Sequence, residues 1–177
     1  MIQTAAAQSA PPSTYAIVIG ISEYENSSIP ALNYAHRDAE AFADYLRSGS
    51  GGYVPESNMY ILIGKKATTA AVYDAMSRLL QKVKEDDRVY FYFAGHGDME
   101  NITIYKLGFL LTYNTPPNNY INNSIRMEDV NNFANTLSAD RKAKVVMITD
   151  ACHSGKLAGS NFRGNLLVGK QLRTTTA

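Results

Sequence analysis

Four apolar runs constrain the fold of this chain more than any other feature of its 177 residues. Each run is rich in β-branched or aromatic residues, which is typical of a strand buried on both faces. Segments with apolar residues at helical spacing separate the runs. The resulting order, β-α-β-α-β-α-β, predicts an α/β fold with a doubly wound, mostly parallel sheet flanked by helices. The runs are Tyr15–Ile21, Met59–Ile63, Arg88–Ala94 and Ala143–Thr149.

Three helices are expected between these strands. The first ends near Gly49, and Thr68 or Thr69 caps the second. The third carries Glu128 and Asp129 in its first turn, where acidic residues suit the helix dipole. The apolar stripes are Ala35, Ala39, Phe42 and Leu46; Val72, Ala75, Met76, Leu79, Leu80 and Val83; and Val130, Phe133, Ala134 and Leu137.

Two segments before the third helix fall outside the alternating order of strands and helices. Ile102–Ile104 and Leu107–Leu111 are expected to pair as a small hairpin beside the main sheet. Thr112–Asn123, which contains two prolines and several asparagines, is expected to form a surface loop.

One globular domain is expected, because 177 residues that are 45% hydrophobic can bury a sizeable core. We place this domain at residues 15–155. Residues 1–14, rich in Ala, Gln, Ser and Pro, are expected to form a flexible extension without the features of a signal peptide. Residues 156–177 are expected to form a flexible loop or tail.

Charge and hydropathy argue against two classes of partner. The net charge of +1 gives no indication of binding to nucleic acid or to a membrane surface. No run approaches the roughly 18 apolar residues that span a bilayer.

The single cysteine cannot form an internal disulfide, which favours a reducing compartment and a cytoplasmic location.

That single cysteine, Cys152, follows the last predicted strand in the sequence Asp150-Ala151-Cys152-His153-Ser154-Gly155. Open α/β sheets place their chemistry at the carboxyl ends of strands. If Ser154 and Gly155 turn into a helix, its N-terminal amides favour a thiolate over a thiol. A lone cysteine can equally be a small buried hydrophobic residue, and this stretch alone does not decide between the two.

A second motif, Gly95-His96-Gly97-Asp98, follows the strand Arg88–Ala94. Its glycines allow a tight turn and a close backbone approach to a ligand. An imidazole titrates in the range that a base for a thiol nucleophile requires. If the two strands are neighbours, His96 and Cys152 face each other at the same edge of the sheet.

These two motifs resemble those of the caspase-like cysteine peptidases, and within them the metacaspases and bacterial orthocaspases. Caspases carry Gln-Ala-Cys with a histidine about 50 residues upstream. In this chain His96 lies 56 residues before Cys152, and Asp150 replaces the glutamine, as in metacaspases. The resemblance covers residues 15 to 155 and depends on both motifs together.

The resemblance implies a caspase-like fold and peptide hydrolysis by a Cys-His dyad. It implies that Cys152 attacks the scissile carbonyl and that His96 protonates the leaving amine and then activates water. It also implies that the backbone N–H groups of Cys152 and Gly97 bind the oxyanion, which is typically worth about 10²–10³ in rate. Caspase-like enzymes commonly orient the histidine with a backbone carbonyl, which the sequence does not identify.

No cofactor and no metal ion are expected. Many metacaspases depend on calcium through a cluster of aspartates, and we find no such cluster in the sequence. The expected partners are protein or peptide substrates.

A carboxylate two residues before the nucleophile predicts the specificity. A buried Asp150 beside the substrate pocket would pair with a cation and repel an acid, so we expect cleavage after Arg or Lys and not after Asp. Asp38 falls where metacaspases carry a second pocket aspartate. The alternative is a solvated charge at a helix start. His36, near the same helix start, is expected to be a surface residue, and His153 is expected not to be the base.

The segment after Cys152 is too short for the small-subunit part that caspase-like folds normally continue into. The chain is therefore expected to correspond to a large subunit that needs a small-subunit segment or a second chain. If the enzyme cuts after basic residues, four positions in the tail are candidate processing points, although scattered charge in an ordinary terminus explains them equally well. They are Lys156, Arg163, Lys170 and Arg173.

Two other chemistries fail on a required residue. A tyrosine-phosphatase loop needs an arginine six residues after the cysteine, where this chain has Ala158. A Walker A loop needs a glycine where this chain has Asp150. The remaining alternative is a catalytically silent scaffold of the same fold in a regulatory or defence assembly.

Overall fold

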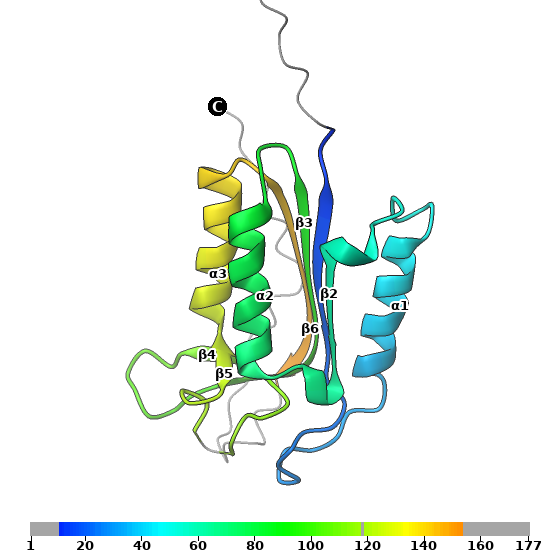
Figure 1. The fold of residues 1–177 in the computed structure, drawn as a ribbon. Coiled ribbons are helices and arrows are strands. Elements are labelled where there is room, and N and C mark those ends of the chain that lie inside the picture. Colours follow the sequence, from blue (N-terminus) through cyan, green and yellow to red (C-terminus); the bar gives the residue numbers. More distant parts are fainter. Residues whose placement is uncertain (1–10, 118, 154–177) are drawn as a thin grey trace, which may run out of the picture.

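The computed structural model describes residues 11–117 and 119–153, and within them a sheet of six strands flanked by helices (Figure 1). The helices are α1 (Ala35–Arg47), α2 (Thr69–Lys82) and α3 (Met127–Asn135), with short turns at Glu56–Asn58, Gly64–Lys66 and Thr136–Asp140. The strands are β1 (Thr14–Gly20), β2 (Met59–Ile63), β3 (Arg88–Met99), β4 (Gly108–Leu111), β5 (Ser124–Arg126) and β6 (Lys144–His153).

The predicted parallel sheet is confirmed. Four strands run parallel in the order β2-β1-β3-β6. The short strand β4 pairs antiparallel with the end of β3, and β5 pairs antiparallel with β4. In the described part of the chain, β6 pairs with β3 alone.

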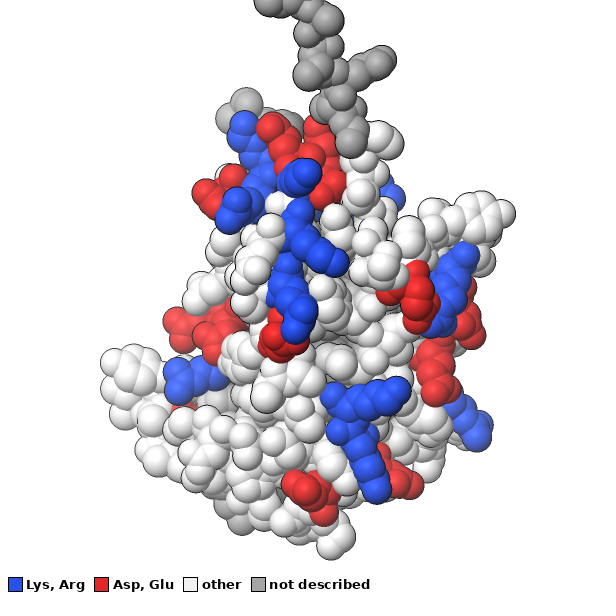
Figure 2. Space-filling model, viewed as in Figure 1, with Lys and Arg blue, Asp and Glu red and all other residues white. Residues whose placement is uncertain are grey.

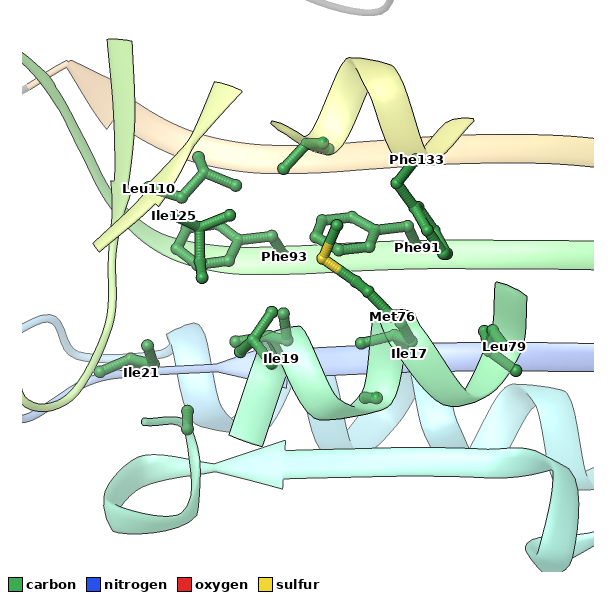
Figure 3. Packing of buried hydrophobic residues seen from close by; sticks show 14 of the residues in the cluster. Ile17, Ile19, Ile21, Met76, Leu79, Phe91, Phe93, Leu110, Ile125 and Phe133 are labelled. Carbon is green, nitrogen blue, oxygen red and sulfur yellow. The ribbon is translucent and has the colours of Figure 1, made fainter. Parts of the chain in front are cut away.

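Helices cover both faces of this sheet, with α1 on one face and α2 and α3 on the other (Figure 1). Side chains alternate along each strand, so one strand feeds both layers. Ile17 and Ile19 of β1 pack with Phe91 and Phe93 of β3 against Met76 of α2 (Figure 3). The intervening residues of the same two strands pack against α1; they are Ala16, Val18, Tyr92 and Ala94.

The three helices form where the apolar stripes predict them. Thr68 is the N-cap of α2, and its side chain accepts a hydrogen bond from the Ala71 N–H. The cap of α1 comes from outside the helix, because the hydroxyl oxygen of Ser22 accepts the N–H of His36 at 3.1 Å. His36 is half-buried, and its Nδ1 lies 2.6 Å from the same hydroxyl, so this residue is less exposed than expected.

The expected hairpin between Ile102–Ile104 and Leu107–Leu111 is wrong, because Gly108–Leu111 pairs with the end of β3 instead. The buried carboxylate of Glu100 explains the difference. It accepts the N–H groups of Ile102, Thr103 and Leu107, so the backbone between β3 and β4 bonds to a side chain rather than to another strand.

The described residues of Thr112–Asn123 form no strand or helix, as expected, but the segment is not simply a surface loop. Thr112, Thr115 and Tyr120 are buried, and the Thr112 N–H donates to the Thr115 hydroxyl. The loop therefore contributes to the core beside β4.

Charged side chains of both signs are interspersed over the face shown in Figure 2. Among the described residues, none of the helices has the length and apolar character that crossing a membrane requires.

Candidate active site

The strands β3 and β6 bring the two predicted motifs together. Both strands extend further than the sequence predicts, β3 through Met99 and β6 through His153. They extend because they continue to pair with each other beyond Ala94, where β1 ends. In this register His96 lies opposite Cys152, so the two residues are neighbours across the sheet.

His96 is held from two sides by the loop that follows β1. Its imidazole Nε2 lies 2.8 Å from the carbonyl oxygen of Pro30, and its backbone N–H donates to the hydroxyl of Tyr24 at 2.8 Å. The side chain is buried, with 4% of its surface exposed. Within residues 11–117 and 119–153, Nδ1 of His96 has no hydrogen-bond partner.

Gly97 allows β6 to lie close to β3 at this point. A Cβ atom built on Gly97 would lie 3.1 Å from the Cβ of Ala151 on β6. Such a contact is tighter than ordinary packing, so a side chain here would push the strands apart. The glycine after His96 therefore preserves the register that brings His96 and Cys152 together.

The carboxylates of Asp38 and Asp150 both influence the phenol of Tyr92. Burial raises the pKa of Tyr92, and the negative charges of Asp38 and Asp150 raise it further. Tyr92 stacks on Phe42 of α1 with ring centroids 4.6 Å apart. Both carboxylates are exposed in the described structure, which differs from the expectation of a buried Asp150. The fold thus brings a helix residue and a strand residue to the same aromatic surface.

The sequence analysis missed Pro30 and Tyr24. No motif identifies Pro30, because the group that contacts His96 is a backbone carbonyl, which every residue has. Tyr24 offers a weak signal, as an aromatic residue in the polar segment between β1 and α1.

The described residues do not test every expected feature. The four candidate processing points and the expected helix start at Ser154 lie outside the described residues. Within the described residues, no group of three or more His, Cys, Asp or Glu side chains is placed to hold a metal ion. A groove of about 690 Å³ lies between α1 and β2, at the sheet edge opposite β6, and contains none of the predicted site residues.

Comparison with solved structures supports the fold. A crystal structure of a protein from Geobacter sulfurreducens matches with a TM-score of 0.62 and 19% sequence identity. The match covers 83% of this chain and 53% of that protein, so this chain spans about half the length of its structural neighbour. No curated protein matches the chain.

Comparison with protein families agrees with the two motifs and with the sheet that joins them. The model of the caspase domain matches residues 13–173, which include both His96 and Cys152. The chain therefore belongs to the caspase domain family of cysteine peptidases.

Proposed function

We propose that this chain is the catalytic part of a cytoplasmic endopeptidase that cuts after Arg or Lys, with Cys152 as nucleophile and His96 as acid and base. The observation that carries the proposal is the register of β3 and β6, in which His96 lies opposite Cys152. This register supports the proposal, because a thiol peptidase needs its nucleophile and its base close together.

In the proposed mechanism the Pro30 carbonyl fixes the histidine ring. A carbonyl oxygen only accepts hydrogen bonds, so Nε2 of His96 carries a hydrogen and Nδ1 is free to exchange a proton. Nδ1 takes the proton of the Cys152 thiol, and the thiolate attacks the substrate carbonyl carbon. Collapse of the tetrahedral intermediate breaks the C–N bond, and the Nδ1 proton passes to the leaving amine.

The second half of the reaction returns the enzyme to its starting state. Nδ1 removes a proton from water, and the resulting hydroxide attacks the thioester. Collapse releases the new carboxylic acid and the Cys152 thiolate, which is reprotonated by His96. The N–H groups of Gly97 and Cys152 stabilise the oxyanion in both halves.

The proposed specificity depends on Asp150 and Asp38. A lysine or arginine side chain near Tyr92 would meet two carboxylates, which favour a cation. An aspartate side chain would be repelled. In the described chain both carboxylates are exposed, so a substrate residue or an adjoining segment would supply their burial.

A small-subunit segment or second chain is part of the proposal. Strand β6 is ten residues long, and in the described structure its second edge has no partner strand. Val146 on this strand is 38% exposed. Such an edge is suited to pairing with another strand. Processing at basic residues after Cys152 is a possible activation step that agrees with the proposed specificity.

The proposal is tested by hydrolysis of fluorogenic peptides that differ only in an Arg, Lys or Asp before the cleaved bond. We expect the full chain to cleave the Arg and Lys peptides, and Cys152→Ala or His96→Ala to reduce the rate to background. Circular dichroism must show that both variants are folded. Asp150→Asn should lower kcat/KM for the Arg peptide by about 10²-fold. Glu40→Gln, on the exposed surface of α1, is the matched control and should have no effect.

The same assay separates the enzyme from a silent scaffold. Cleavage after Asp would overturn the specificity. No cleavage of any peptide by the chain together with its small-subunit segment, before or after limited proteolysis, would favour the scaffold.

A further inference from the structure

The backbone of His96 lies at a gap in the sheet. Gly97 pairs with both β6 and β4, and Ala94 pairs with both β6 and β1, so β1 and β4 lie on the same edge of β3. On that edge the pairing with β1 ends at Ala94, and the pairing with β4 covers Gly97 to Met99. The N–H of His96 lies between these two pairings.

The hydroxyl of Tyr24 fills this gap. The carbonyl of Ala94 accepts the Ile21 N–H at 2.9 Å, so groups two residues further along β3 point to the same side. The next such group is the N–H of His96, which donates to the Tyr24 hydroxyl at 2.8 Å. A side chain from 72 residues away thus replaces the missing strand carbonyl.

The ring of Tyr24 also contacts the imidazole. The two ring centroids are 5.4 Å apart, with 35° between the ring planes. Tyr24 is buried, with 8% of its surface exposed, and burial raises the pKa of its phenol, so the hydroxyl stays neutral over the physiological range. One side chain therefore contacts His96 at both its backbone and its ring.

The position of Tyr24 is itself fixed. The next residue, Glu25, donates its N–H to the carbonyl of Tyr113 at 2.9 Å, which ties the loop after β1 to the segment after β4. A Cβ built on Gly95 would lie 3.2 Å from the Tyr24 hydroxyl oxygen and 3.0 Å from the Phe93 ring. Gly95 therefore leaves the space that the phenol needs to reach the backbone of β3.

We propose that Tyr24 is a positioning residue for His96, which sets the backbone and ring orientation from which Nδ1 exchanges protons with Cys152. This inference rests on the proposed function. Tyr24 contacts neither substrate nor nucleophile in the proposal and acts only through His96. The loop at the carboxyl ends of β1 and β3 (Figure 1) then holds the histidine at three points, through the Pro30 carbonyl, the Tyr24 hydroxyl and the Tyr24 ring.

The test compares Tyr24→Phe with Tyr120→Phe in the full chain. Tyr120 is a matched control because its phenol is also buried and also bonds to β3, where it donates to the carboxylate of Asp98 at 2.8 Å. Its ring packs against Phe109 rather than against an imidazole, with ring centroids 6.0 Å apart. Both variants lose one buried hydroxyl, so a general loss of stability affects both.

Two readouts report on His96 directly. One is the pH titration of the His96 imidazole by NMR, and the other is the pH profile of Cys152 alkylation by iodoacetamide. We expect Tyr24→Phe to shift the His96 titration and to slow alkylation near neutral pH about tenfold, because small misplacements of a catalytic group have large effects. Tyr120→Phe should leave both readouts as in the wild type. The proposal is overturned if Tyr24→Phe also leaves both unchanged, or if the two variants shift them equally.

A second variant decides the matter if Tyr24→Phe does not fold. Gly95→Ala keeps the hydroxyl but displaces it by a few tenths of an ångström, so it should shift the His96 titration in the same direction by a smaller amount. An unchanged titration would overturn the proposal.

His96→Ala separates this inference from the proposed function. If His96→Ala leaves the alkylation profile unchanged, the dyad is wrong, and the NMR titration still decides whether Tyr24 positions His96.

Discussion

Nε2 of His96 and the carbonyl oxygen of Pro30 lie 2.8 Å apart, although 66 residues separate them in the sequence. The contact joins the loop after β1 to the end of β3. It fixes the tautomer of the neutral imidazole. Because a carbonyl cannot donate a hydrogen bond, Nε2 must carry the hydrogen.

We therefore predict that neutral His96 is the Nε2–H tautomer. The measurement is ¹⁵N NMR of the chain labelled at histidine, at about pH 8.5, where an ordinary histidine is neutral. His96→Ala assigns the resonance among the three histidines. A neutral His96 with its hydrogen on Nδ1 would contradict the contact with Pro30.

The carboxylates of Asp38 and Asp150 should be detectable through Tyr92 without any substrate. Their charges contribute to the raised pKa of its phenol, so Asp38→Asn and Asp150→Asn should each lower that pKa towards 10, and the double variant should lower it further. NMR of ¹³Cζ-labelled tyrosine measures the titration. Glu40→Gln on the same helix is the control and should not change it. If neither asparagine variant moves the Tyr92 titration, the two carboxylates do not share this surface.

Glu100 should make the loop after β3 sensitive to acid. Hydrogen bonds from the Thr103 hydroxyl and from the N–H groups of Thr103, Leu107 and Ile102 lower the pKa of this carboxyl to about 2. An unfolded glutamate has a pKa of about 4.3, so the ionised group stabilises the fold above that pH. This contribution is lost as the pH falls towards 2.

The variant Glu100→Gln tests this interpretation. We expect its melting temperature to depend less on pH between about 4.3 and 2 than that of the wild type, because the group that titrates is gone. The Leu107 amide should exchange faster with solvent at neutral pH, since its carboxylate acceptor is lost. Glu128→Gln, an exposed position on α3, should leave both measurements unchanged. Equal pH profiles for wild type and Glu100→Gln would refute the assignment.

Gly20 should tolerate no side chain, because α1 packs directly on the end of β1. A Cβ there would lie 2.5 Å from the Cβ of Ala39 and 2.7 Å from the carbonyl oxygen of Ala35. Overpacking of this kind typically costs 1–3 kcal/mol, so we expect Gly20→Ala to lower the free energy of unfolding by about 2 kcal/mol. Urea denaturation measures it.

Gly108→Ala is the control for that experiment. Its nearest contact would be 3.4 Å from Met127, which is ordinary packing, and we expect a change within about 0.5 kcal/mol. If both variants lose a similar free energy of unfolding, the cause is the replacement of a strand glycine rather than the contact with α1.

The sequence predicts the parts of this fold that depend on local pattern. The buried strands and the apolar stripes of the helices are such parts, because period and composition reflect burial directly. The motifs at His96 and Cys152 are also local, and the parallel order of the strands then implies that they meet. The structure confirms this meeting through the register of β3 and β6.

Features that depend on long-range geometry are not predictable in this way. The ends of β3 and β6 were misjudged because each strand is extended by the other, not by its own composition. The hairpin at Ile102–Ile104 was wrong because a single carboxylate, Glu100, replaces the strand partner. The Pro30 carbonyl carries no side-chain signal at all.

The long separations at His96 have a consequence for the order of events during synthesis. Its partners lie 66 and 72 residues earlier in the chain, whereas β6 with Cys152 follows every other described strand. Contacts between such distant segments form late, after the intervening chain has condensed. An incompletely folded chain therefore contains His96 and Cys152 but lacks the β3–β6 register that places them opposite each other. If Cys152 is the nucleophile that we propose, its reactivity depends on this last pairing of the sheet.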